Sequence, residues 1–351
     1  STRPLRVGLI GMGGIADATH FPAWKELQDE GRVEIVAGAD IRLETAQIMG
    51  EKWGFKGVHT DYKAMLKEHQ LDIVDICVHN RYHCDATVAA LKAGAHVLVE
   101  KPMAMSVAEA VKMEKTAADA GRKLMVAQHF RFEAGAQKVK QLVDAGELGD
   151  IYTARAVWLR RRGIPGWGRF HIAEESLGGP LADIGVHVMD LCVWLMGSPK
   201  PVSVSGSVYR KFGDRDDLVN TMASGYERKT FDVEDHAIAL VRFDGGQSMI
   251  VEASWAANIA QDVLDVSLMG DKGGATVFPA RYHSYDRDSL TTRNYDWMPQ
   301  LRGHREEIRH FTECLEQGKP VLVQPRESVN IQKIIMGMYE SARKGREIAL
   351  K

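Results

Sequence analysis

Three ionisable side chains in this sequence stand where their types and spacing suit proton transfer. Lys101 lies in Glu100-Lys101-Pro102 directly after a short apolar run, at the end of a strand where parallel sheets bind their ligands. Asp183 and His187 are four residues apart, so they share one face of a helix. Histidine exchanges a proton near neutral pH without perturbation. These three residues are the expected catalytic groups of a site that deprotonates a hydroxyl; the alternatives are a solvated lysine and an ordinary helix-surface pair.

A glycine-rich turn adds a second chemical function. The run Gly11-Met12-Gly13-Gly14-Ile15-Ala16 fits G-x-G-x-x-A and stands between an apolar run and a helix-like stretch. Gly11 allows the tight turn and Gly13 lets the backbone approach a pyrophosphate, which the N-terminus of the following helix attracts. The alternative is an ordinary turn between a strand and a helix. The motif predicts dinucleotide contacts from Gly11, Met12, Gly13, Gly14 and Ile15.

The residue after the second strand-like run bears on the choice of cofactor. Asp40 is placed to accept hydrogen bonds from the ribose hydroxyls of adenosine, as NAD binding requires. Its carboxylate repels a 2′-phosphate, so NAD is favoured over NADP, whereas Arg42 suits a phosphate and keeps NADP open. Ile41, between them, is expected in the same cofactor wall. The structural alternative is that Asp40 caps a helix.

The first half of the chain alternates two periodicities. Strand-like runs lie at 5–10, 33–39, 73–78, 96–99 and 123–128, with a weaker one at 57–59, and helix-like stretches lie at 15–27, 44–53, 83–92 and 107–120. Strands that are apolar on both faces and alternate with helices indicate a parallel sheet covered on both sides. The sequence therefore predicts an α/β fold that begins with a Rossmann dinucleotide-binding domain over residues 1–128.

The pattern changes from about residue 149. Strand-like runs follow one another with few helices between them, at 151–159, 202–209, 236–243, 247–255, 263–269 and 275–278, and helices are expected at 180–196, 303–317 and 328–344. Successive strands imply a mainly antiparallel sheet. We expect residues 129–351 to form an α/β domain that binds substrate. The open face of its large sheet would pair with another subunit and give a homodimer or homotetramer.

Two longer motifs carry a family resemblance. Residues 83–102 read H-x(7)-L-x-A-G-x-H-V-x-x-E-K-P, and residues 178–190 read G-G-x-x-x-D-x-G-x-H-x-x-D. Together with the glycine-rich turn, and in this order, they resemble the glucose–fructose oxidoreductase / inositol dehydrogenase (Gfo/Idh/MocA) family over nearly the whole chain. The resemblance implies a Rossmann domain, a C-terminal domain with a large open sheet, and NAD(P)-linked oxidation or reduction at a hydroxyl or ketone of a sugar, cyclitol or sugar derivative.

The chemistry of the three ionisable residues suggests a hypothesis for their roles. His187 would be the more direct acid/base, Lys101 would polarise the reacting oxygen, and Asp183 would hold a neighbouring hydroxyl; the assignment between Lys101 and His187 stays open. His79 stands where the family often has a proline. The remaining residues expected to contact the cofactor are Val78, His79, Asn80, His83, Glu100 and Lys101.

A basic, glycine-containing loop at 160–170 is a candidate for closing over the cofactor. Trp167 and Arg169 would then contact the cofactor, and a solvated loop is the equally weighted alternative. The expected substrate contacts are Lys101, His129, Arg161, Asp183 and His187. Further pocket candidates, each more simply explained as structural, are His20, His283 and Tyr285.

Composition excludes several other classes. The 351 residues carry 45 basic and 47 acidic side chains, a net charge of −2, which does not suit a nucleic-acid partner. No stretch approaches 18 apolar residues, so no membrane partner is expected. The start shows no signal-peptide core, and four cysteines without a CxxC pair suggest reduced thiols in the cytoplasm. No metal site is expected.

Two competing functions remain open. One is a redox-assisted glycoside-cleaving or epimerising enzyme, which would return the hydride and form no net NADH. The other is an NAD-sensing binding protein without turnover, although such a protein needs no Lys101, Asp183 and His187 together. A sugar or polyol dehydrogenase is the leading interpretation.

Overall fold

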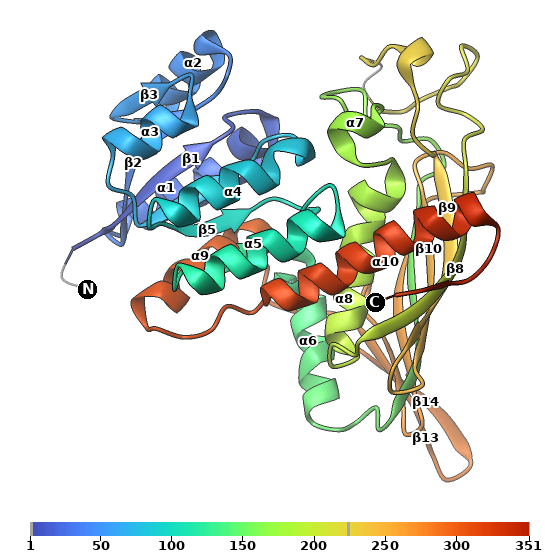
Figure 1. Cartoon of the computed structure of the whole chain (residues 1–351). Helices are drawn as coiled ribbons and strands as arrows, with labels where there is room; N and C mark the ends of the chain where they lie inside the picture. The colour runs from blue at the N-terminus through green and yellow to red at the C-terminus, as the bar shows by residue number, and fades with distance from the viewer. Residues whose placement is uncertain (1–2, 223–224, 351) are drawn as a thin grey trace. The chain divides into compact units, whose positions relative to one another are not determined.

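The structure is a computed structural model that describes residues 3–222 and 225–350, and it divides into two compact units (Figure 1). The first unit contains residues 1–129 and 302–329, and the second contains residues 130–301 and 330–351. The segment 302–329 thus packs with the N-terminal unit, whereas the sequence places it in the domain 129–351.

The first unit is built on a six-stranded parallel sheet. Its order is β3-β2-β1-β4-β5-β6, and its strands are β1 (Leu5–Ile10), β2 (Val33–Ala39), β3 (Gly57–His59), β4 (Ile73–Ile76), β5 (His96–Val99) and β6 (Leu124–Val126). Ile10 pairs with Ala39 on one side and with Ile76 on the other. The strand order reverses between β1 and β4, and the residues that follow β1, β2 and β4 share one edge, which is where such sheets bind ligands.

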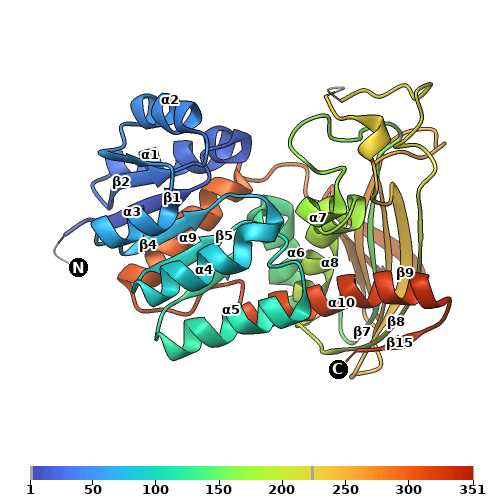
Figure 2. The ribbon, with the colours of Figure 1, turned by 45° about the horizontal axis from the view of Figure 1, so that its top comes forward.

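Helices cover both faces of this sheet. Neighbouring helices α3 (Tyr62–Glu68), α4 (His83–Lys92) and α5 (Val107–Asp119) lie on one face, and α1 (Phe21–Asp29) and α9 (Gly303–Glu316) lie together on the other (Figure 2). A π-helical turn, Ala16–His20, leads into α1, and α2 (Leu43–Trp53) follows β2. Strands β4 and β5 are almost wholly buried, as expected for a parallel sheet with two covered faces.

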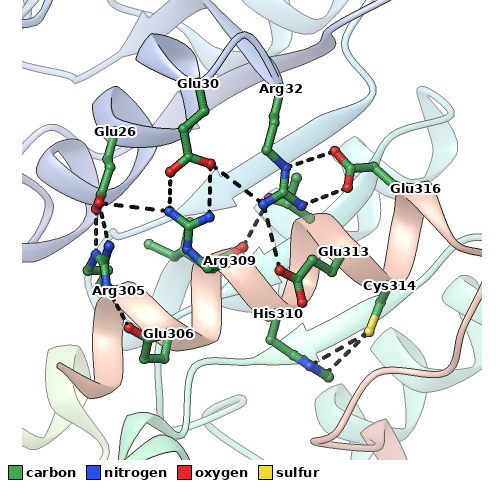
Figure 3. Close-up of polar contacts among 12 residues, drawn as sticks. Glu26, Glu30, Arg32, Arg305, Glu306, Arg309, His310, Glu313, Cys314 and Glu316 are labelled. Carbon is green, nitrogen blue, oxygen red and sulfur yellow. Dashed lines mark hydrogen bonds and ion pairs between the residues drawn. The ribbon is translucent and has the colours of Figure 1, made fainter. Parts of the chain in front are cut away.

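Ion pairs join α9 to the end of α1 and the start of β2 (Figure 3). Arg305 binds both carboxylate oxygens of Glu26, and Arg309 binds those of Glu30. Arg32 donates to Glu316 through Nε and Nη2 at 3.1 and 2.6 Å. Paired guanidinium–carboxylate contacts fix orientation as well as distance, so they set how the C-terminal segment lies on this unit.

The second unit is built on a nine-stranded mixed sheet. Its order is β14-β13-β12-β11-β7-β10-β9-β8-β15; β7 and β10 pair in parallel and the other neighbours are antiparallel. The strands are β7 (Ile151–Leu159), β8 (Pro201–Tyr209), β9 (His236–Phe243), β10 (Ser248–Ser254), β11 (Val263–Gly270), β12 (Gly274–Thr276), β13 (Arg281–Asp286), β14 (Ser289–Asn294) and β15 (Ile348–Ala349).

Helices of the second unit pack on one face of this sheet. Helix α8 (Val186–Leu195) lies against β7 and β11 and contacts α6 (Ala134–Asp144). Helix α10 (Pro325–Lys344), which belongs to this unit from residue 330, packs closely on β8, where a Cβ on Gly337 would lie 2.8 Å from Val204 Cγ1. Short helices α7 (Ala173–Ser176) and Arg228–Thr230 lie in the loops. The fold class expected from the sequence is confirmed.

One expected helix is divided. The sequence predicts a single helix over 180–196, but the structure has a π-helical turn, Leu181–Gly185, followed by α8. Asp183 lies in the π turn and His187 in α8, so the simple four-residue spacing argument does not describe their geometry. Within the described residues, none of the helices combines the length and apolarity needed to cross a membrane.

Candidate active site

The glycine-rich turn is closed by contacts that only glycine allows at its first position. Gly11 has φ of 89°, donates to Ala39 O at 2.8 Å, and a Cβ on it would lie 2.5 Å from Cys77 O. The backbone after β1 therefore packs directly on the segment after β4. Val78 forms part of the same contact, because its Cγ1 would lie 2.9 Å from that Cβ.

The two glycines that follow, Gly13 and Gly14, are not explained by packing within the chain. A Cβ on Gly13 or Gly14 would meet no atom of the chain within 4 Å, so the fold itself does not require glycine there. Gly13 precedes and Gly14 begins the helical stretch that buries Ala16, and N–H groups in a first helical turn lack partners within the helix. Ile15, beside them, is 41% exposed despite being apolar. These features fit a surface that a phosphate-containing ligand approaches closely.

Asp40 is fixed by two backbone donors. Its Oδ2 accepts from Met12 N at 3.0 Å and its Oδ1 accepts from Arg42 N at 2.9 Å, while Arg42 Nε lies 3.5 Å from Oδ1. The expected contact partners thus meet at one carboxylate, and each of its oxygens retains a further lone pair for a hydroxyl donor. Neighbouring Ile41 is 85% exposed. Arg42 itself is the N-cap residue of α2, so Asp40 is not a helix cap.

Lys101 sits in a turn that is held from both sides. Its backbone N donates to Glu100 Oε2 at 3.0 Å. His83 Nδ1 lies 2.8 Å from Pro102 O, and its Nε2 lies 3.1 Å from Val78 O. Burial lowers the pKa of His83, and the buried ring joins the turn after β5 to the loop after β4. His83 thus positions the turn of Lys101, and its expected cofactor contact stays a prediction.

A buried charge network lies beneath this turn. His20 is fully buried, with Nδ1 2.8 Å from Asp75 Oδ2 and Nε2 3.0 Å from Glu100 Oε1. Trp24 Nε1 also donates to Asp75, at 2.6 Å. Burial by itself disfavours the charge on His20, but the carboxylate of Asp75 holds the pKa of the imidazole well above its usual value. His20 is therefore the cation that balances two buried carboxylates.

The pKa of Glu100 shifts in the opposite direction to that of His20. Burial by itself would raise its pKa, but the hydrogen bond and charge of His20, with the charge of Lys101, lower the pKa of Glu100 to about 2. Both groups are consequently ionised at neutral pH. The ionised Glu100 is what holds the backbone N of Lys101.

Two further histidines stack in the first unit. The rings of His129 and His304 have centroids 3.9 Å apart and an interplanar angle of 17°. Burial is the main reason that the pKa of His129 lies well below its usual value and that of His304 is lowered to about 4. The positive charges of His20 and Lys101 act in the same direction. Both rings are neutral at physiological pH, which permits the stacking. His304 carried no sequence signal, because its partner lies far away along the chain.

In the second unit, a buried glutamate shapes the Gly178-Gly179 turn. Glu234 accepts from Gly179 N at 2.9 Å, Leu181 N at 3.1 Å and Tyr339 Oη at 3.0 Å. A Cβ on Gly179 would lie 1.9 Å from Glu234 O, so the two glycines are required by packing. Burial raises the pKa of Glu234 against these hydrogen bonds. This residue positions the π turn that carries Asp183.

The predicted acid/base pair of this unit sits on the divided helix. Asp183 Oδ2 accepts from Trp255 Nε1 at 2.9 Å, and Trp255 is fully buried in a cluster with Ile164 and Ile184. His187 is buried beside aromatic rings, with centroids 5.2 Å from Phe130 and 6.3 Å from Trp158. The last aspartate of the motif has a structural role: Asp190 binds Arg131 through two contacts of 2.7 Å.

The basic loop is anchored by its arginines. Arg161 N donates to Asp262 Oδ1 at 2.7 Å and its Nη1 to Ala260 O at 3.1 Å. Trp167 is 50% exposed, and Arg169 Nε lies 3.7 Å from Glu175 Oε1. Their expected contacts with cofactor and substrate stay predictions.

The structure thus gathers the predicted residues into two sets. The first unit brings Gly11–Ile15, Asp40, Val78–Asn80 and Lys101 to one edge of its sheet, and the second unit holds Asp183 and His187 on one helical segment. Sequence reasoning missed Asp75, Glu234 and Trp255, which hold the surroundings of these two sets in place, and His304, which stacks on His129. Such residues have no local signal, because their partners come from other elements.

Comparison with known proteins agrees with both units. Residues 5–128 match the oxidoreductase family with an NAD-binding Rossmann fold, and residues 136–276 match the GFO/IDH/MocA C-terminal domain. D-glucoside 3-dehydrogenase of Escherichia coli (strain K12) is 36% identical over 352 residues, covering 100% of this chain and 99% of that protein. D-apiose dehydrogenase of Paraburkholderia graminis is 26% identical over 369 residues, covering 98% and 89%.

A solved structure shows the same fold. An oxidoreductase domain protein from Kribbella flavida superposes with a TM-score of 0.87 at 23% identity, with 100% of both chains covered. The resemblance inferred from the three motifs is confirmed by both matching domains and by the full-length relative. This chain therefore belongs to the GFO/IDH/MocA family of NAD-binding oxidoreductases.

Proposed function

We propose that this protein transfers a hydride between a nicotinamide cofactor and a hydroxyl or ketone of a sugar, cyclitol or sugar derivative. The observation that carries the proposal is the placement of Lys101. It follows β5 at the sheet edge that also holds the glycine-rich turn after β1, with only β4 between the two strands. Two strand spacings amount to about 10 Å. The two similar enzymes from Escherichia coli and Paraburkholderia graminis are named for carbohydrate substrates.

We propose NAD rather than NADP as the preferred cofactor. The carboxylate of Asp40 is held by two backbone N–H groups, so a fixed negative charge stands where a ribose is expected. A 2′-phosphate there would be repelled. The exposed apolar side chains of Ile15 and Ile41 offer a surface to the remainder of the nucleotide. Arg42 is exposed and already paired with Asp40, which leaves it a weak counter-ion for a phosphate.

The chemistry is divided between cofactor and protein. The nicotinamide supplies the hydride acceptor or donor when bound. His187 and Lys101 exchange the proton of the reacting hydroxyl and polarise its oxygen, and Asp183 accepts a hydrogen bond from a neighbouring hydroxyl. The bond from Trp255 keeps that carboxylate oriented. The four cysteines are buried and free, which suits a reducing compartment such as the cytoplasm.

The test is the absorbance of reduced nicotinamide on mixing the protein with NAD or NADP and a panel of glycosides, aldoses, inositols and sugar acids. We expect formation of NADH with one class of carbohydrate and weaker activity with NADP. Lys101→Met and His187→Asn should each lower turnover by about 10²–10⁴-fold, while the Kd for NADH changes little. His236→Asn, on β9, is the matched control, because His236 is not among the expected site residues.

Two results would overturn the proposal. Near-normal turnover in both Lys101→Met and His187→Asn would remove the catalytic assignment. Tight NADH binding without net NADH formation on any substrate would favour a redox-assisted or sensing protein. Tighter binding of NADPH than of NADH would reverse the cofactor assignment alone.

A further inference from the structure

Two histidines and a glutamate meet at the edge of the parallel sheet, away from the residues assigned above. His59 is the last residue of β3, the edge strand. Glu68 ends α3, and His69 follows it as the C-cap residue, with its N donating to Met65 O at 3.0 Å. All three belong to the first unit. No metal site is expected from the sequence, whereas the fold brings these three side chains together.

The two imidazoles face each other through their Nε2 atoms. His59 Nε2 lies 3.0 Å from His69 Nε2, and the ring planes are 81° apart. Glu68 Oε1 lies 3.9 Å from His69 Nε2, and Glu68 Oε2 lies 4.0 Å from His59 Nδ1. One donor atom from each of the three residues can be chosen so that all lie within 4.8 Å of one another.

Gly57 lies against the two imidazoles, and its lack of a side chain leaves space for them. A Cβ on Gly57 would lie 2.7 Å from His69 Nε2 and 3.3 Å from His59 Nε2. Any other residue at this position would therefore push against both nitrogens. The side chains of His59 and His69 are only 12% and 17% exposed, whereas Glu68 is 66% exposed and has freedom to move towards them.

We propose that His59, Glu68 and His69 bind a divalent transition ion of the zinc type. Zinc takes imidazole nitrogen at about 2.0–2.1 Å and carboxylate oxygen at about 2.0–2.2 Å in a tetrahedral arrangement, with water as a fourth ligand where the protein supplies three. Tetrahedral angles then place two nitrogens about 3.4 Å apart. From the 3.0 Å contact, the rings need to separate by a few tenths of an ångström and to turn so that both nitrogen lone pairs point at the ion. The exposed carboxylate of Glu68 supplies the third ligand.

The ion would act as a structural clamp. It ties the end of α3 to the edge strand β3, whose pairing with β2 is short. His59 O accepts from Asp40 N at 3.1 Å, so the clamped residue is bonded to the backbone that carries Asp40. The site stands independently of the proposed hydride transfer.

The test uses the untagged full-length protein after treatment with a chelator. Zinc is titrated against a chromophoric competitor, and Co²⁺ absorption reports the coordination geometry. We expect one equivalent of zinc, a tetrahedral Co²⁺ spectrum and a higher Tm with zinc. His59→Gln and His69→Gln should each weaken zinc binding on the order of 100-fold or more, since loss of a ligand exceeds the effect of losing a supporting partner.

The matched control is His236→Gln. His236 Nε2 lies 3.2 Å from Glu252 in the second unit and pairs one imidazole with one carboxylate; zinc affinity should be unchanged. Zinc binding that survives both His59→Gln and His69→Gln, or no binding at micromolar zinc, would overturn the proposal. If either histidine variant fails to fold by circular dichroism, the exposed Glu68→Gln decides. Because the neutral amide oxygen of Gln is a poorer zinc ligand than a carboxylate, binding weakened by about tenfold or more supports the site, and unaltered affinity overturns it.

Discussion

Among single residues, His20 compensates two buried carboxylates at once. Asp75 and Glu100 are bonded to opposite nitrogens of its ring. Removing one partner of a buried ion pair leaves charge that water cannot solvate, and costs about 3–5 kcal/mol. His20→Gln should therefore lower the free energy of unfolding by about that amount, measured by urea denaturation. His283→Gln is the control, and equal stability of the two variants would contradict the role.

The same network predicts how stability depends on pH. Glu100 has a pKa lowered from 4.5 to about 2, so its contribution is complete above 4.5 and is lost as pH falls towards 2. The pKa of His20 is raised above 6.5, so its contribution is complete below 6.5 and fades as pH rises through the raised value. We expect maximal stability between these limits. Urea midpoints measured across pH should fall towards both low and high pH. His20→Gln should make this dependence on pH weaker.

At the scale of elements, the glycine-rich turn separates a requirement of the fold from a requirement of the ligand. Gly11→Ala places a Cβ 2.5 Å from Cys77 O at a positive φ, so it should lower both Tm and NADH affinity. Gly13→Ala meets open space and should leave Tm nearly unchanged while weakening NADH binding by tenfold or more, since the Cβ stands where the pyrophosphate approaches. Fluorescence titration and thermal melts distinguish the two effects. Unchanged NADH affinity in Gly13→Ala would contradict the expected pyrophosphate position.

Most elements were predictable because their periodicity is local. The parallel strands are apolar on both faces and alternate with amphipathic helices, so their number and their parallel pairing followed from the sequence. The hairpin β13–β14 was missed because β14 is exposed throughout and carries no apolar alternation. The π turn at 181–185 was missed because it arises from tertiary contacts, namely those of Glu234 and Trp255, rather than from helix propensity.

The candidate site likewise contains residues that the sequence predicts and residues that only the fold reveals. Gly11, Asp40, Lys101, Asp183 and His187 stand in motifs that the sequence displays. The groups that fix them, such as Glu234 and Asp75, are single acidic residues within strand or loop segments. Only the fold brings Glu234 to Gly179 or Asp75 to His20. Long-range hydrogen bonds of this kind leave no spacing that a sequence pattern can register.

For the whole molecule, the outward face of the nine-stranded sheet is the surface that association would use. Cross-strand register places the apolar side chains of Tyr209, Ile238, Leu240, Ile250 and Met269 on one face. Ile238 and Ile250 are each 39% exposed. The same face carries charged pairs such as Arg155 with Asp265, 3.3 Å apart. Partly exposed apolar side chains that gather over several strands are typical of an interface between identical subunits, whereas charged pairs suit its rim.

We therefore expect a homodimer or homotetramer formed through this sheet. Ile238→Lys combined with Ile250→Lys should dissociate it, because two like charges would be buried against their symmetry mates, while the sheet interior is untouched. Light scattering coupled to size exclusion, over a range of concentrations, measures the mass. Val111→Lys on α5 is the matched control, since Val111 is also 39% exposed but lies in the first unit. A monomeric unmodified protein, or a double variant of unchanged mass, would show that this face is not the interface.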